Sequence, residues 1–95
     1  MPALPGLGDG SMPSYLVETY VPRARAADAR DTGRRARSAA AAMALEGTPV
    51  RYIRTAFVPG DETCFHFFEA ASEDVVDEAC KRAGISSPRI VPVVE

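Results

Sequence analysis

The side chains best suited to chemistry in this sequence are a histidine and a cysteine two positions apart. His66 is the only histidine among the 95 residues, and Cys64 precedes it in a segment with strand character. Residues i and i+2 of a strand point to the same face, so imidazole and thiol are expected side by side. Imidazole nitrogen, thiolate and carboxylate oxygen are ligands for divalent transition metals. The pair therefore predicts part of a metal shell, with His66 as its anchor.

Carboxylates are available to extend such a shell. Glu18 belongs to a strand that we expect to lie beside the strand of His66, and Asp61 and Glu62 form a more exposed pair at a hairpin turn. With one histidine per chain, the remaining ligands would be water or residues of a second copy. The candidate metal ligands are therefore His66, Glu18, Cys64, Asp61 and Glu62.

The same residues also admit interpretations without a metal. A lone histidine in a strand is more often a hydrogen-bonded structural residue than a ligand. The Cβ atoms of residues i and i+2 are roughly 7 Å apart, which is loose for a nucleophile and its base. Without a ligand, Glu18 and Arg54 are expected to form an ion pair across the sheet. Cys80 lies on the apolar stripe of a helix and is expected in the core.

Six segments must position these residues. An alanine-rich stretch with small residues at i, i+3, i+4 and i+7 predicts a long helix, which Gly47 and Pro49 end. Ser72 is a good N-cap for a second helix, and Pro59 opens a tight turn between two strands. The predicted elements are strand 15–20, helix 25–46, strand 50–57, strand 63–69, helix 73–83 and strand 89–94. This β-α-β-β-α-β order predicts an α+β fold, the ferredoxin-like split βαβ plait, with both helices on one face of an antiparallel sheet.

Period-two alternation assigns the strand residues to two faces. We expect Phe65 and Phe67 to pack beneath the helices, because two large rings would complement the alanine stripe of helix 25–46. Tyr15 and Val17 are expected to point inward with them. The open face of the sheet would then carry the remaining set: Leu16, Glu18, Tyr20, Tyr52, Arg54, Cys64, His66 and Phe68.

An uncovered sheet face with apolar members predicts a contact with a second copy of the chain. Leu16 and Phe68 have no reason to be bare in a monomer. A homodimer with facing sheets would bury both side chains. We therefore expect a homodimer whose interface is the open face.

Length and composition set limits on the function. The 95 residues fit one domain, which we expect at 12–95, with residues 1–11 as a flexible tail. The formal charge of −2 argues against a nucleic-acid partner, because phosphate neutralisation requires a basic excess. No apolar run approaches the ~20 residues of a membrane span. Two cysteines are too few for a secreted domain stapled by disulfides, so a cytoplasmic location is expected.

Four stretches carry a resemblance to a known family. They are YLVETYVP, the alanine-rich helix, GTPVRYIRTAFVPGDETCFHFFEA and the closing CKRAGISSPRIVPVVE. Over residues 12–95 the chain resembles a family of small actinobacterial ferredoxin-like proteins, a domain of unknown function described in part as nickel-binding. The run from Val58 to Cys64 is the most specific part. The resemblance implies a ferredoxin-like subunit, a homodimer and binding of Ni(II), in a storage, buffering or sensing role without catalysis.

A second class of function stays open. Ferredoxin-like dimers often enclose a cavity between two sheets, and such a cavity can host small oxygenase or isomerase chemistry. Tyr20, Tyr52, His66 and Glu18 would then be acid, base or orienting groups. A small dimeric α+β barrel enzyme is therefore the alternative to a metal-binding protein.

Overall fold

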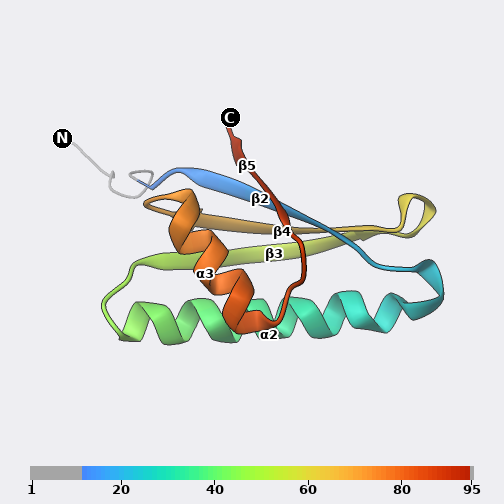
Figure 1. Ribbon diagram of the computed structural model, residues 1–95, viewed down its shortest axis with the longest axis horizontal. Coiled ribbons are helices and arrows are strands. Elements are labelled where there is room, and N and C mark those ends of the chain that lie inside the picture. Colours follow the sequence, from blue (N-terminus) through green and yellow to red (C-terminus); the bar gives the residue numbers. More distant parts are fainter. Residues whose placement is uncertain (1–11, 95) are drawn as a thin grey trace.

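The computed structural model describes residues 12–94, and their elements follow the predicted order (Figure 1). Each helix and strand ends within one residue of its predicted range. The expected tail, residues 1–11, lies outside the described residues. In chain order the elements are β2 (Ser14–Tyr20), the 3-10 turn η2 (Arg23–Arg25), α2 (Ala26–Leu45), β3 (Val50–Val58), the 3-10 turn η3 (Pro59–Asp61), β4 (Thr63–Ala70), α3 (Glu73–Ala83) and β5 (Arg89–Val93).

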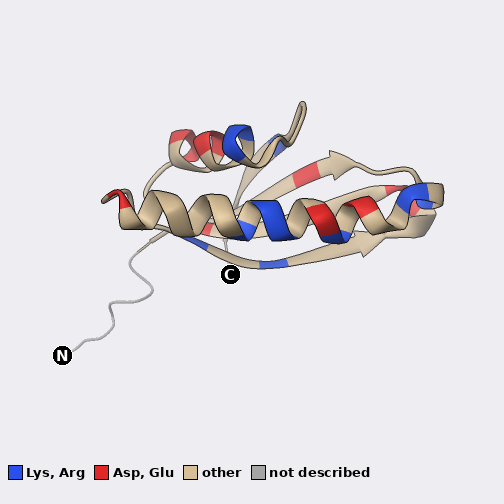
Figure 2. Ribbon diagram, turned by 90° about the horizontal axis from the view of Figure 1, so that it is seen from below, with Lys and Arg blue, Asp and Glu red and all other residues tan. Residues whose placement is uncertain are grey.

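The four strands form one antiparallel sheet in the order β3-β4-β2-β5. The hairpin of β3 and β4 is confirmed, and Pro92 lies in the edge strand β5, where a missing N–H is tolerated. Both helices lie on one side of the sheet, with α2 running along β3 (Figures 1 and 2). The predicted α+β plait is confirmed, whereas the homodimer stays a prediction.

The shorter helix begins and ends where its sequence indicates. The Ser72 hydroxyl accepts a hydrogen bond from the backbone N–H of Val75 at 3.4 Å, which satisfies one of the unpaired donors of the first turn. Gly84 ends α3 with a φ of 73°, a left-handed conformation that glycine adopts without a steric cost. The chain is thereby turned back toward β5.

Small residues let α2 approach the sheet closely. A Cβ at Gly33 would lie 2.8 Å from Thr55 Oγ1 and 3.2 Å from the Tyr52 hydroxyl oxygen. Glycine is therefore the residue that fits where α2 crosses β3. The buried residues of α2 have the predicted helical spacing: Ala29, Gly33, Ala36, Ala39, Ala40 and Met43.

The predicted face assignment of β4 is wrong. Cys64 and His66 have no exposed surface and Phe68 is 1% exposed, so all three point toward the helices. Phe65 and Phe67 alternate with them and are partly exposed on the opposite face. The alanine stripe thus packs over an imidazole, a thiol and one phenyl ring instead of two phenyl rings.

Strand pairing explains the reversal. Val17 is fully buried, as predicted, and its Cα partner in β4 is His66. Tyr15, which packs against the core, is paired in the same way with Phe68. Directly opposed residues of antiparallel strands point to the same face. Inward positions for Tyr15 and Val17 therefore require inward positions for Phe68 and His66.

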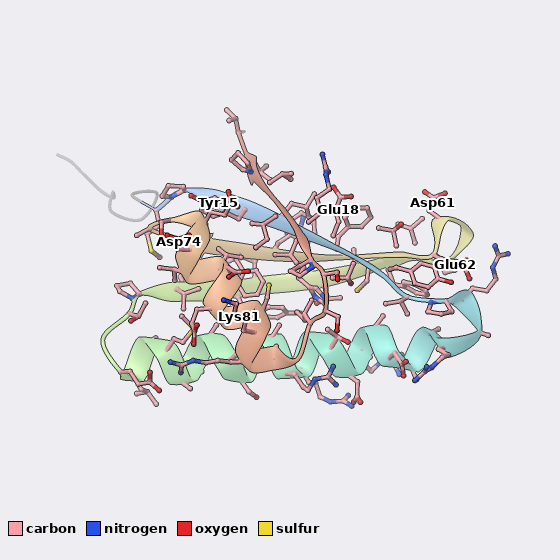
Figure 3. All side chains as sticks on the ribbon, viewed as in Figure 1. Tyr15, Glu18, Asp61, Glu62, Asp74 and Lys81 are labelled. Carbon is pink, nitrogen blue, oxygen red and sulfur yellow. The ribbon has the colours of Figure 1, made fainter. Side chains whose placement is uncertain are left out.

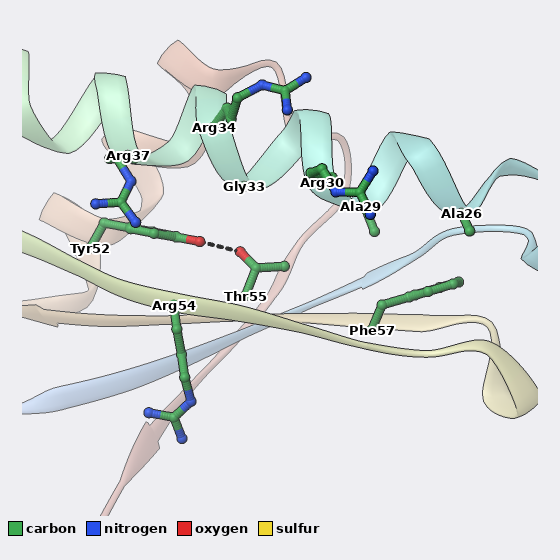
Figure 4. A pocket seen from close by; sticks show the side chains of 10 residues that line it. All are labelled: Ala26, Ala29, Arg30, Gly33, Arg34, Arg37, Tyr52, Arg54, Thr55 and Phe57. Carbon is green, nitrogen blue, oxygen red and sulfur yellow. Dashed lines mark hydrogen bonds between the residues drawn. The ribbon is translucent and has the colours of Figure 1, made fainter.

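Tyr52 is paired with the inward-pointing Phe68 and lies on the helix side instead of the predicted open face, and a β-bulge separates it from Arg54. Between Tyr52 and Arg54 the partners in β4 advance by one residue while β3 advances by two, so Ile53 is an extra residue. Tyr52 and Thr55 consequently share the helix side, where their hydroxyls are 2.6 Å apart. Arg54 points to the other side, as Figure 4 shows, and its guanidinium lies 4.2 Å from the ring centroid of Phe67.

The opposite side of the sheet keeps Leu16 and Glu18, as predicted. Glu18 pairs with Arg89 at 2.7 Å, because these residues face each other across β2 and β5. The expected ion pair between Glu18 and Arg54 is therefore wrong. We define the open face by the residues of this side used below: Leu16, Glu18, Arg51, Arg54, Phe65, Phe67, Glu69 and Arg89.

Candidate functional site

His66 is at the centre of a row of side-chain contacts beneath α2. Its Nδ1 atom lies 2.7 Å from Thr55 Oγ1, which is 2.6 Å from the Tyr52 hydroxyl oxygen. Its Nε2 atom lies 3.6 Å from Cys64 Sγ. We call Tyr52, Thr55, His66 and Cys64 the buried polar cluster. The predicted proximity of imidazole and thiol is present, on the face opposite to the expected one.

Burial sets the protonation of this cluster. Desolvation lowers the pKa of His66 from 6.5 to about 4, because burial disfavours the charged imidazolium. Desolvation also raises the pKa of the Cys64 thiol, against a smaller lowering by its hydrogen bond with Thr19. At neutral pH the cluster therefore holds a neutral imidazole and a protonated thiol.

The predicted carboxylate ligands do not join the cluster. Glu18 lies on the open face with Arg89, and Asp61 and Glu62 lie at the far end of the β3–β4 hairpin (Figure 3). Glu62 accepts a hydrogen bond from the backbone N–H of Arg23 at 2.8 Å, which ties the hairpin to the start of α2. Within residues 12–94, His, Cys, Asp and Glu side chains form no group of three or more that could hold a metal ion.

The four side chains proposed as acid, base or orienting groups of an enzyme are also not gathered on one face of the sheet. Tyr52 and His66 lie on the helix side of the sheet, whereas Glu18 lies on the open face and Tyr20 is 70% exposed at the end of β2. Acid and base groups on opposite faces cannot act on one bound molecule. A cavity between two sheets would therefore not contain this set.

Sequence analysis did not identify Thr55 as a partner of His66. Gly33 could have indicated this contact. Glycine destabilises the middle of a helix, so its presence there often marks a place where the helix backbone closely approaches another element. Its missing side chain leaves space for the hydroxyls of Thr55 and Tyr52. The bulge at Ile53, which aligns the two hydroxyls, has no comparable sequence signal.

The donor types of the buried polar cluster fit nickel in part. Imidazole and thiolate both suit Ni(II). A separation of 3.6 Å between Sγ and Nε2 is close to that of two donors on one tetrahedral ion with bonds of about 2.3 and 2.0 Å, as in zinc sites. A hydrogen bond from Nδ1 to Thr55 would orient the ring as it does for many metal-bound histidines. The cluster contains two donor atoms of the types that could bind such an ion, Cys64 Sγ and His66 Nε2.

Over residues 15–93 the chain matches the model of the family described as nickel responsive protein SCO4226-like. No curated protein and no solved structure matched the chain. Among the described residues, neither helix has the length and apolar character that crossing a membrane requires.

Proposed function

Because the chain belongs to the SCO4226-like family of nickel responsive proteins, we propose that it is a non-catalytic protein that binds nickel to store, buffer or sense it. The observation that carries the proposal is the pair of Cys64 Sγ and His66 Nε2 at 3.6 Å. These atoms anchor the ion; both side chains are fully buried, so water or groups from outside this chain supply its other ligands only when the packing around the pair opens. Ni(II) has affinity for thiolate and imidazole ligands, and this pair would supply one of each.

Proton release accompanies this binding. The burial that raises the pKa of Cys64 keeps its thiol protonated at neutral pH, and only the thiolate is a strong ligand. Each bound ion must therefore displace the thiol proton, so nickel affinity rises with pH. The neutral imidazole of His66, whose pKa is about 4, needs no deprotonation in the same range.

A titration with Ni(II) tests the proposal. Thiolate coordination gives a charge-transfer absorption, and calorimetry gives the affinity and the released proton. We expect saturable binding by the wild type, and loss of the absorption in Cys64→Ser and His66→Gln. Cys80→Ser is the matched control, because Cys80 is also free and buried but belongs to α3. Absence of binding by the wild type, or an unchanged signal in a folded Cys64→Ser variant, would refute the ligand assignment.

We also propose that the open face joins two copies of the chain. Leu16, Phe65 and Phe67 give it apolar surface, each side chain being partly exposed. An interface with twofold symmetry sets the same patch against itself, so a patch suited to it must carry both signs of charge. The open face does so through the ion pairs Glu18–Arg89 at 2.7 Å and Arg51–Glu69 at 3.2 Å.

Sedimentation of wild type and two variants tests the dimer. Phe67→Glu places a charge at the apolar part of the open face and should shift the protein toward a monomer. Leu45→Glu is the matched control, because Leu45 is 89% exposed at the end of α2, away from that face. A wild type that is monomeric at micromolar concentration would contradict the proposal.

Both cysteines bear on where this chemistry can take place. Cys64 and Cys80 are free, and the proposed ligand role requires Cys64 to stay reduced. Thiols persist in the reducing cytosol, whereas secreted proteins tend to oxidise theirs. We therefore propose a cytoplasmic location, which fractionation of the producing cell would check.

A further inference from the structure

A groove of about 500 Å³ lies between α2 and the edge strand β3 (Figure 4). It is separate from the sulfur and imidazole of the proposed nickel ligands. From α2 it is lined by residues on one face of the helix, and from β3 by Tyr52, Arg54, Thr55 and Phe57. The lining from α2 consists of Ala26, Ala29, Arg30, Gly33, Arg34 and Arg37.

The groove is positively charged. No Asp or Glu lines it. Arg34 is paired with Asp31, but no carboxylate among residues 12–94 pairs with Arg30 or Arg37. An arginine keeps its charge at every physiological pH. The groove therefore repels a bare metal cation and attracts an anion.

Arg30 and Arg37, the two arginines of α2 in the groove without an ion pair to residues 12–94, are separated along the helix. Arg30 and Arg37 are seven residues apart on α2, which is about 10 Å along a helix with a rise of ~1.5 Å per residue. Figure 4 shows the Arg37 guanidinium directed toward Tyr52 of β3 and the Arg30 side chain lying along α2 beside Ala29, with Gly33 between the two arginines. This spacing provides two separate positions for acidic groups.

The floor between these positions is apolar with a hydroxyl edge. Arg37 lies over the ring of Tyr52, with its guanidinium carbon 5.0 Å from the centroid, and Phe57 and Ala29 line the other end. Because position 33 has no side chain, the Tyr52 and Thr55 hydroxyls reach the helix backbone between the two arginines. A ligand here would meet the Tyr52 ring and the two hydroxyls at its middle and a guanidinium at each end.

We propose that this groove binds an elongated organic dianion, with one carboxylate at Arg30 and the other at Arg37. The middle of the ligand lies along the ring of Tyr52, beside the hydroxyls of Tyr52 and Thr55. Charged hydrogen bonds at both ends fix its length, and the apolar floor selects a carbon chain over a bare inorganic anion. This site is additional to nickel binding and does not depend on Cys64.

Titration with four probes tests the proposal: adipate, hexanoate, succinate and inorganic phosphate. Adipate places two carboxylates on a six-carbon chain, hexanoate keeps the chain with one, and succinate is shorter. We expect adipate to bind about tenfold more tightly than the other three, as one additional charged hydrogen-bonded end would give. The NMR signals of the single imidazole should shift on binding, because Thr55 contacts both the groove and His66.

Variants decide whether the arginines hold the two ends. Arg37→Gln should lower the adipate affinity to that of hexanoate for the wild type, and Arg30→Gln should do the same. Arg23→Gln is the matched control, because it makes the same charge change at an exposed residue outside the groove. The proposal is overturned if no probe binds saturably, if phosphate binds as tightly as adipate, or if Arg23→Gln weakens binding as much as Arg37→Gln.

Discussion

Acidification should destabilise the fold through one residue, His66. The unfolded chain takes up a proton on this imidazole near pH 6.5, whereas burial lowers the folded-state pKa to about 4. Between these values the unfolded state binds more protons, so the free energy of unfolding falls as the pH falls. The contribution is complete above pH 6.5 and is lost by pH 4. The gap corresponds to about 3 kcal/mol.

The surroundings of the ring explain why the imidazolium is so poorly accommodated. A charged ring donates from both nitrogens. Thr55 Oγ1 beside Nδ1 is already shared with Tyr52, and the group beside Nε2 is the protonated thiol of Cys64. With His66 fully buried, water reaches neither nitrogen. Protonation therefore costs close to the full desolvation of the charge.

Denaturant unfolding at about pH 7.5, 6.0 and 4.5, a range that covers most of the interval between the two pKa values, measures the effect. We expect the wild type to lose about 2.5 kcal/mol across this range, and His66→Gln to lose much less, because glutamine does not titrate. Exposed Glu46, whose pKa is lowered by its hydrogen bond with Arg82, loses its own contribution only at lower pH. A ring that titrates near pH 6.5 in the folded protein, seen as the one histidine signal by NMR, would refute the reasoning.

Three further predictions follow from the packing. Gly33→Ala should destabilise the protein by about 1–3 kcal/mol in thermal or denaturant unfolding, because the new Cβ would lie 2.8 Å from a hydroxyl of β3. Phe68→Ala should lower the free energy of unfolding by about 3–5 kcal/mol, as for a buried phenyl ring. Phe67→Ala on the open face should lower it by about 1 kcal/mol or less, and equal losses would contradict the face assignment. Thiol labelling of the folded protein should be slow at both Cys64 and Cys80. Burial raises the pKa of both thiols, that of Cys80 to about 12, so few are in the reactive thiolate form. Fast labelling of either cysteine would show that the core opens readily.

The order and limits of the elements could be predicted because local signals determine them. Gly84 in a left-handed conformation and Ser72 at the N-cap act within one helical turn, and the turn at Pro59 acts over three residues. These signals do not depend on which other segments are nearby. The sequence therefore predicted every boundary to within one residue.

Local signals could not predict which face of the sheet carries the candidate site. Alternation divides β4 into two sets but does not say which set is covered, and the size of Phe65 and Phe67 favoured the wrong set. Pairing of Val17 with His66 decides the matter, and that pairing joins residues far apart in the chain. The bulge at Ile53 adds a second shift that a strict two-residue period misses.

The two edge strands of the sheet, β3 and β5, affect how readily the protein aggregates in concentrated solution. An exposed strand edge can recruit strands from other molecules and seed fibrils. Pro92 interrupts the donor row of β5, and the extra residue at Ile53 distorts the row of β3. Both features disfavour pairing between the edge strands of neighbouring molecules. Polymerisation through the strand edges is therefore disfavoured at both sides of the sheet.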